Sequence, residues 1–262
     1  MAALRSVRFW WWVTLIVLVV SLIPMAWISL DTHIVADDYA SSVETHQAWV
    51  QTHNPLAVLG AAAQFAATYY QEWQGSYAAN FLFALHPGIW GESLYFLTTF
   101  VMLGVFLLCN AYFFRKIFRD ALHVAEPKLA GVVSNLTAFF SIQLAVLPSD
   151  AFFWWNGSAY YVIFYSLMLP LLANAIVSLA QNRCGGTRLA GMLVLAVCVA
   201  GGNLVTGLVA AELLALGFLV SLLRRRKVSV ALGLVLAVYL GGFFLNVNAP
   251  VRMCASPQGW KC

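Results

Sequence analysis

Long apolar runs separated by short polar segments dominate the pattern along this chain. The first run, from Trp10 to Leu30, contains no charged residue. At 1.5 Å per residue a helix of this length crosses a hydrocarbon core of about 30 Å. A cleaved signal peptide is the alternative, but the run is too long and lacks a small-residue cleavage site at its end. Similar runs follow at 93–114, 130–147, 159–180, 189–223 and 228–245.

Composition agrees with this pattern. Of 262 residues, 62% are hydrophobic and 9% charged, whereas a soluble domain carries about 25% charged residues. The chain is therefore predicted to be an integral membrane protein with lipids as neighbours. Soluble enzymes, disordered chains, disulfide-rich secreted modules and nucleic-acid-binding proteins are excluded as classes.

Positive charge predicts the orientation, because cytoplasmic loops near span ends are enriched in Lys and Arg. Twelve of the fourteen basic residues fall in four clusters, at 5–8, 115–128, 183–188 and 224–227. All four lie on one side only if the run 189–223 crosses twice, with a turn at 201–203. We therefore expect an all-α polytopic protein of about seven transmembrane helices, with the amino terminus inside and the carboxyl terminus outside. The arms of that hairpin are short, so a tilted or re-entrant pair is an alternative.

Three segments are predicted to face outward from a single transmembrane domain, 1–262. The first loop, 31–92, has six acidic and no basic residues. Residues 37–53 fit a short amphipathic helix, and Asn54-Pro55 should cap and start a second helix that continues to about Tyr70. Both helices are expected to lie along the outer membrane surface. The second loop, 148–158, and the tail, 246–262, complete the outward face.

Asp37, Asp38 and Tyr39 follow the first span closely. A carboxylate at the membrane interface can act as a general base on an acceptor hydroxyl, or hold a divalent cation. The alternative is a helix start, with Asp37 as the cap and Asp38 in the first turn.

Aromatic and amide side chains are concentrated in the outward loops. They supply the flat faces and hydrogen-bonding groups that bind a sugar or an isoprenoid head group. An interfacial aromatic belt is the alternative. The candidate substrate contacts of this kind are Tyr39, Tyr70, Trp73, Trp155, Asn156 and Tyr160.

Two charged residues occupy unusual positions. Glu212 stands in the middle of an apolar span, where a carboxylate marks a functional site or bonds a neighbouring helix. Arg252 follows the last span on the outer side, where its planar fork could bind a lipid phosphate or snorkel to head groups. Beyond it, Cys254 and Cys262 could pair in an oxidising compartment.

The order of these features resembles the GT-C superfamily of membrane glycosyltransferases. The resemblance rests on the acidic pair Asp37 and Asp38, the intramembrane Glu212, and three short motifs. Two departures are Ser76, where such proteins have Arg, and Val251-Arg252, where they have Gly-Asn. The motifs are Tyr70, Trp73 and Gly75; Trp155, Asn156 and Gly157; and Asn248, Pro250 and Arg252.

The resemblance implies a polyprenyl-phosphate-linked sugar as donor, a first-loop Asp as base, and a later Arg that meets the donor phosphate. It also implies substrate contacts at Glu212 and Asn248. The expected function is thus sugar transfer to an extracytoplasmic glycan, lipid or protein acceptor, at a bacterial inner membrane. The alternative is a non-enzymatic flippase, transporter or assembly subunit in which Glu212 and the short hairpin do the work.

Overall fold

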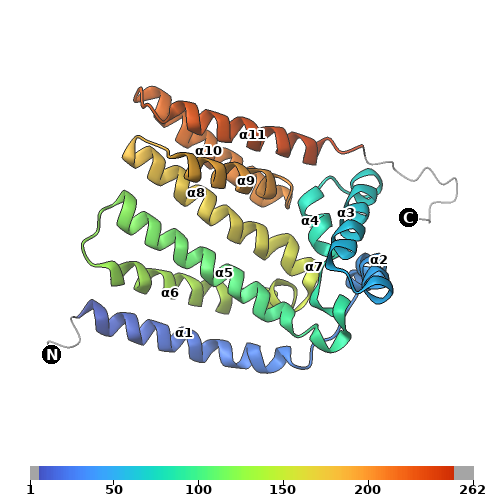
Figure 1. The fold of residues 1–262 in the computed structure, drawn as a ribbon. Helices are drawn as coiled ribbons and strands as arrows, with labels where there is room; N and C mark the ends of the chain where they lie inside the picture. Colours follow the sequence, from blue (N-terminus) through green and yellow to red (C-terminus); the bar gives the residue numbers. More distant parts are fainter. Residues whose placement is uncertain (1–5, 251–262) are drawn as a thin grey trace.

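The computed structural model describes residues 6–250, and this part of the chain is helical without a strand. Long helices lie side by side in one bundle (Figure 1). The bundle helices are α1 (Val7–Ser29), α5 (Leu97–Lys116), α6 (Pro127–Gln143), α8 (Phe164–Gln181), α9 (Gly186–Ala200), α10 (Leu204–Leu223) and α11 (Ser229–Val247). Helix α1 packs against α6, α6 against α5, and α5 against α8. Helix α8 packs against α9 and α10, and α11 is outermost against α9 and α10.

Within residues 6–250, five helical segments are long and apolar enough to cross a membrane, which supports an all-helical, membrane-integral protein. The other two bundle helices are shorter, since α6 has 17 residues and α9 has 15. The predicted turn at 201–203 does separate α9 from α10. Seven crossings remain a prediction. The five segments are Val7–Ser29, Glu92–Ala121, Trp155–Gln181, Leu204–Leu223 and Ser229–Val247.

A few polar side chains join the bundle helices. Asn110 on α5 donates from Nδ2 to the carbonyl oxygen of Ser134 on α6, at 2.9 Å. The hydroxyl of Tyr239 on α11 donates to the carbonyl of Gly207 on α10, at 2.8 Å. Hydrogen bonds of this kind and small residues at contacts are what hold helices together where lipid removes the hydrophobic drive between them.

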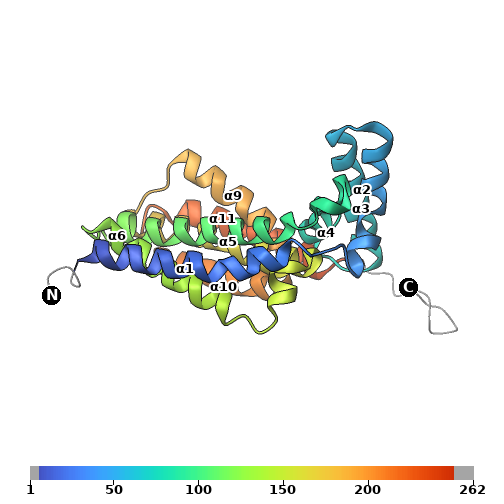
Figure 2. The same cartoon turned by 90° about the horizontal axis from the view of Figure 1, so that it is seen from below.

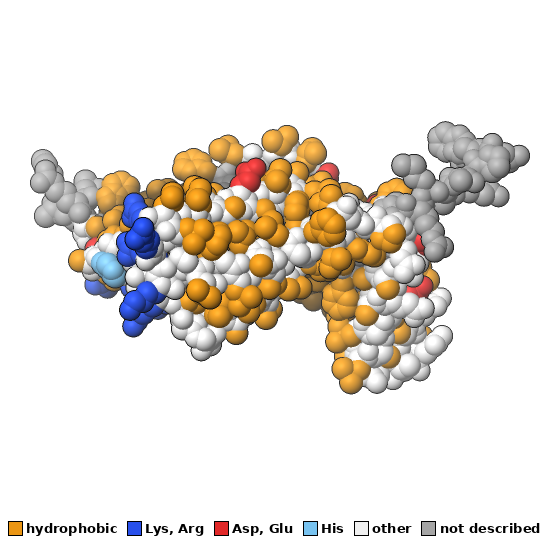
Figure 3. Space-filling model, turned by 90° about the horizontal axis from the view of Figure 1, so that it is seen from above, with side chains coloured by type: hydrophobic (Ala, Val, Ile, Leu, Met, Phe, Trp, Pro, Cys, Tyr) orange, Lys and Arg blue, Asp and Glu red, His pale blue; other side chains and the backbone are white. Residues whose placement is uncertain are grey.

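Basic side chains gather at one end of the bundle, as the space-filling view in Figure 3 shows. This end carries the amino terminus of α1 and the turns between α5 and α6, α8 and α9, and α10 and α11 (Figure 1). Three of the four predicted basic clusters lie wholly at this end, and Arg8 represents the fourth because Arg5 is outside the described residues.

Three further helices lie at the opposite end, in the predicted first outward loop: α2 (Asp37–Thr52), α3 (Pro55–Glu72) and α4 (Tyr77–Phe83). The α2–α3 hairpin runs across the direction of the bundle helices (Figure 2). The expected helix break is present, since the side-chain oxygen of Asn54 accepts from the Leu56 N–H at 2.9 Å and Pro55 opens α3.

In α2, polar residues face inward and apolar ones face outward. Ser41 and Thr45 of α2 are buried, whereas Tyr39, Val43 and Val50 are each at least half exposed. The expected interfacial helix has its apolar residues on the exposed face, as contact with lipid would require.

Gly75 brings the loop and the last helix into close contact. A Cβ atom at this position would lie 1.8 Å from the carbonyl oxygen of Asn246. Asn246 in turn donates from Nδ2 to the carbonyls of Ala200 and Gly202, both at 2.8 Å. The start of α4, the α9–α10 turn and the end of α11 therefore meet at one point.

We predict that Gly75→Ala destabilises the protein by about 1–3 kcal/mol or more, because the atom that it meets is backbone and cannot rotate away. Gly60→Ala is the matched control, since Gly60 lies within α3 and a Cβ there meets nothing within 4 Å. The control should stabilise by about 0.5–1 kcal/mol. Denaturant titration in mixed micelles measures both values, and equal effects of the two changes would contradict the close contact.

Candidate functional site

An open pocket of about 530 Å³ lies where the two outward loops meet. Its walls come from the start of α2, the end of α3, α4 and the segment 150–161. The lining residues are Asp37, Ser41, Tyr69, Trp73, Gln74, Phe83, Asp150, Trp154, Asn156, Gly157, Tyr160 and Tyr161.

The two neighbouring carboxylates of α2 point in different directions. Asp37 is exposed and lines the pocket, whereas Asp38 is fully buried. Successive helix positions differ by about 100°, so adjacent residues cannot share one environment. The capping interpretation of Asp37 is wrong: Ala36 occupies the cap position without a side-chain bond, and both acids lie in the first turn. Ala36 has φ of 49°, a conformation that favours glycine.

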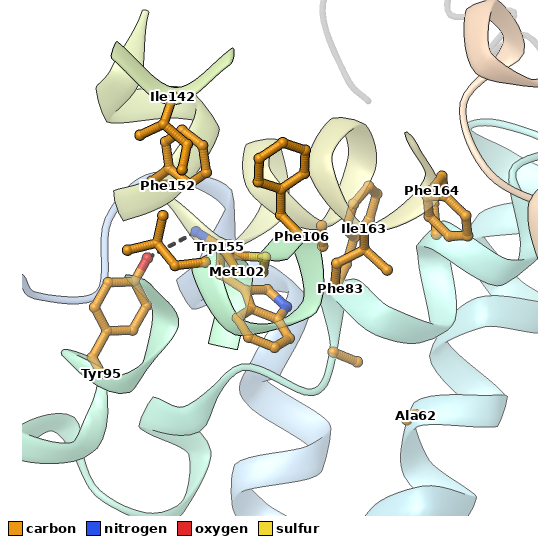
Figure 4. Packing of buried hydrophobic residues seen from close by; sticks show 14 of the residues in the cluster. Ala62, Phe83, Tyr95, Met102, Phe106, Ile142, Phe152, Trp155, Ile163 and Phe164 are labelled. Carbon is orange, nitrogen blue, oxygen red and sulfur yellow. Dashed lines mark hydrogen bonds between the residues drawn. The ribbon is translucent and has the colours of Figure 1, made fainter. Parts of the chain in front are cut away.

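Asp38 joins three segments through its side chain. One oxygen, Oδ2, accepts from the hydroxyl of Tyr95 at 2.5 Å, and Oδ1 accepts from the backbone N–H of Asn156 at 3.1 Å. The Tyr95 hydroxyl also accepts from the backbone N–H of Trp155, at 3.1 Å. Figure 4 shows this last bond beside the buried apolar cluster. The carboxylate and the phenol thus satisfy the free N–H groups that begin α7 (Trp155–Ser158).

Burial raises the pKa of Asp38 to about 6, and the hydrogen bonds from Tyr95 and the Asn156 N–H offset part of that rise. Two more polar groups pack around it. Ser41 accepts a bond from Nδ2 of Asn156 at 3.3 Å. His86 Nε2 lies 3.2 Å from the carbonyl oxygen of Asp38, and burial lowers the pKa of His86 to about 4, so its ring is neutral at pH 7.

Unusual backbone shapes the second loop. Two single π-helical turns, η5 (Ser149–Phe153) and η6 (Ala159–Ile163), flank α7. Such turns are frequent at functional sites. They carry Asp150, Tyr160 and Tyr161, all of which line the pocket. Between them, a Cβ on Gly157 would lie 2.6 Å from the Trp154 ring and 2.9 Å from the Asp150 carbonyl, so the turn has no room for a side chain.

The structure brings four of the predicted site residues together in this pocket. Trp73, Asn156 and Tyr160 line the pocket with Asp37. Trp155 is instead buried, with its indole N–H donating to the Leu82 carbonyl at 2.8 Å.

The other predicted residues that the structure describes do not line the pocket. Tyr70 donates to the Leu245 carbonyl at 2.9 Å and lines a different groove, against α9 and α11. Asn248 bonds the Phe244 carbonyl at the end of its own helix. Glu212 and Tyr39 are exposed elsewhere. Arg252, Cys254 and Cys262 lie outside the described residues.

Sequence reasoning missed several important residues. Tyr69, Gln74 and Tyr161 line the pocket, and Tyr95 and His86 surround Asp38. Tyr69 and Tyr161 could have been predicted only from their sequence neighbours, since each adjoins an aromatic residue that was predicted to contact substrate. Tyr95 lies 57 positions from Asp38, so no spacing rule connects them.

The pocket has negative charge and aromatic walls. Among the described residues that line it, Asp37 and Asp150 are the two carboxylates, and none is Lys, Arg or His. The divalent cation expected between Asp37 and Asp38 would have to displace donors from Asp38, because both of its oxygens accept hydrogen bonds. No group of three metal-ligating side chains occurs within residues 6–250.

An apolar groove of about 500 Å³ adjoins the pocket. The two share Tyr161, and the groove continues between α5, α6, α8 and the start of α10. A ligand with a polar head and an apolar chain would therefore find both environments side by side. Groove residues include Phe106, Ala145, Phe152, Val162, Tyr165 and Val205.

No family model, no curated protein and no solved structure matches this chain. A function for this chain is therefore proposed from the chemistry of the pocket.

We predict that the Asp38 carboxyl makes stability depend on pH. Its pKa is about 6 when folded and 3.8 in the absence of burial, so its favourable contribution is complete below pH 3.8 and is lost as pH rises through 6. Asp38→Asn keeps an acceptor oxygen for one donor but cannot ionise. The stability of this variant relative to wild type should therefore rise between pH 4 and 6.5, by at most about 3 kcal/mol.

Denaturant titrations of both proteins at half-unit pH steps would measure this difference. A difference that stays constant from pH 4 to 6.5 would show that Asp38 does not ionise in a buried site.

Proposed function

We propose that this protein is a membrane glycosyltransferase that moves a sugar from a polyprenyl-phosphate donor to an extracytoplasmic acceptor. The observation that carries the proposal is that a carboxylate-bearing aromatic pocket and an apolar groove share Tyr161 as a lining residue. A donor made of a sugar and an isoprenoid chain has the same two parts. The acceptor is a glycan, lipid or protein hydroxyl.

The pocket suits the sugar. Aromatic rings such as Trp73 and Tyr160 offer flat apolar faces, and their polar edges and neighbouring amides offer hydrogen bonds to hydroxyl groups. The groove suits the first isoprene units, because its walls are chiefly apolar side chains, such as Phe106 of α5, Phe152 of η5 and Val205 of α10.

Asp37 is the proposed general base. It is the acid of the predicted pair that lines the pocket, and its exposure leaves its oxygens accessible to an acceptor hydroxyl. In the reaction the acceptor oxygen loses its proton to Asp37 and attacks the anomeric carbon, and the bond to the donor phosphate breaks. Asp38 is a positioning residue, because its hydrogen bonds hold the Asn156 backbone beside the same pocket.

The departing phosphate needs a cation, and the lining residues within 6–250 include none. Arg252 remains the candidate from the sequence, since the planar guanidinium fork matches a phosphate. Within this proposal the basic end of the bundle faces the cytoplasm, the pocket faces outward, and the chain crosses a bacterial inner membrane seven times.

We predict that Asp37→Asn lowers transfer by a factor of roughly 10² to 10⁴, the usual contribution of a positioned base. The amide keeps the size and polarity of the side chain, so folding should be unchanged. The assay supplies membranes with a short-chain polyprenyl phosphate carrying a radiolabelled neutral sugar. It then follows the label into glycan, lipid and protein fractions.

Glu212→Gln is the matched control, because Glu212 is an acid that does not line the pocket. It should transfer sugar at close to the wild-type rate. If Asp37→Asn is fully active while Glu212→Gln abolishes function, a transporter with a working mid-membrane acid replaces the enzyme.

A further inference from the structure

A second polar cavity lies beside the pocket, after the outer end of α1. Its volume is about 440 Å³, and small-molecule sites occupy roughly 300–1,000 Å³. Asp150 and Trp154 line both the cavity and the pocket. The other residues that line the cavity are Asp31, Thr32, His33, Val35, Ser149 and Phe153.

The chain passes from the cavity to the pocket at the start of α2. Val35 lines the cavity, and Asp37 lines the pocket. Ala36, between them, has φ of 49°. A residue other than glycine keeps such a conformation only where its surroundings enforce it, and such residues cluster at functional sites. The Val35 carbonyl is held in place by the N–H of Asp38, at 3.1 Å. The proposed base therefore lies two residues from the wall of the cavity.

The polar groups of the cavity are mainly hydrogen-bond acceptors. Two hydroxyl donors are already used within the protein: Thr32 donates to the Ser29 carbonyl at 2.7 Å, and Ser149 donates to Oδ1 of Asp150 at 2.9 Å. Within residues 6–250 no group donates to the Asp31 carboxylate or to Oδ2 of Asp150. A ligand that matches this lining brings donors, and hydroxyl groups are such donors.

The apolar part of the lining is chiefly aromatic. Phe153 and Trp154 place flat faces beside the free oxygens, and a sugar ring has apolar faces and hydroxyl groups that fit both. A phospholipid head group fits less well, because its phosphate is an acceptor and the described lining contains no Lys or Arg. An acyl chain would have few apolar side chains to contact here.

We infer that this cavity binds the acceptor, and that the acceptor is a sugar ring of a glycan. The inference rests on the proposed transferase, in which the donor occupies the pocket and the apolar groove. The groove shares Tyr161 with the pocket, whereas the cavity shares Asp150 and Trp154 with it. The two substrates thus meet the pocket at different residues. The acceptor hydroxyl gives its proton to Asp37, its oxygen bonds the anomeric carbon, and the donor phosphate leaves with the bonding electron pair.

Blocking the cavity with a thiol reagent tests the binding site without any need for transfer. The full-length chain, with its five cysteines replaced by Ser, receives Val35→Cys and is labelled with a bulky maleimide. Val43→Cys on α2 is the matched control, because Val35 and Val43 are 44% and 50% exposed and Val43 lines neither the pocket nor the cavity. Saturation-transfer NMR in nanodiscs then measures the binding of neutral di- and trisaccharides. Their signals should disappear with labelled Val35→Cys and persist with labelled Val43→Cys.

The same variants test the role of the cavity in the reaction. With a radiolabelled polyprenyl-phosphate sugar as donor, the label should enter the glycan fraction. Maleimide on Val35→Cys should lower this transfer roughly 10²-fold relative to the unlabelled variant, the usual cost of misplacing one reactant. Photo-crosslinking of the donor to the protein should be unchanged, because the donor occupies the pocket and the groove.

Three results would overturn the inference: saccharide signals that persist with labelled Val35→Cys, radiolabel that enters the lipid or protein fraction instead, or donor crosslinking that is lost when Val35→Cys is labelled. The proposed enzyme is tested separately. If Asp37→Asn transfers normally while saccharide binding still depends on the cavity, the reaction is wrong and the binding site stands. If Asp37→Asn abolishes transfer while labelled Val35→Cys transfers normally, the reaction stands and the acceptor site is wrong.

Discussion

The buried carboxylate of Asp38 is the interaction on which the outer end of this protein depends. It accepts from the Tyr95 hydroxyl and from the first N–H groups of the second loop's helix, directly at Asn156 and through the phenol at Trp155. A buried carboxylate is costly unless several donors satisfy it. The segments that provide those donors are therefore held at fixed positions around α2, and the pocket is the space that they leave.

This arrangement gives two adjacent acids different tasks. The helix start directs Asp38 into the protein and leaves Asp37 in the pocket, facing Asp150 and a set of aromatic rings. Placing the proposed base next to the residue that anchors the loop couples folding of the loop to assembly of the pocket. The apolar groove shares Tyr161 with this pocket and lies against bundle helices that lipid would surround.

Local features of the sequence predicted much of the fold. The apolar runs marked the bundle helices, and Asn54-Pro55 marked the start of α3, because capping and helix periodicity act within a few residues. The site was only partly predictable. Which of Asp37 and Asp38 is buried depends on what packs against α2, and Tyr95 and Asp150 reach the site through contacts distant in sequence. Glu212 was predicted as a substrate contact because sequence cannot show which way a helix face points.

The most direct test of the central claim is a cryo-electron microscopy structure in lipid nanodiscs with a short-chain polyprenyl-phosphate sugar bound. We predict sugar density against Asp37, Trp73 and Tyr160, with the isoprenoid chain passing Tyr161 into the groove beside Phe106. Donor density in the separate groove between α3, α9 and α11, with no contact to Asp37, would contradict it.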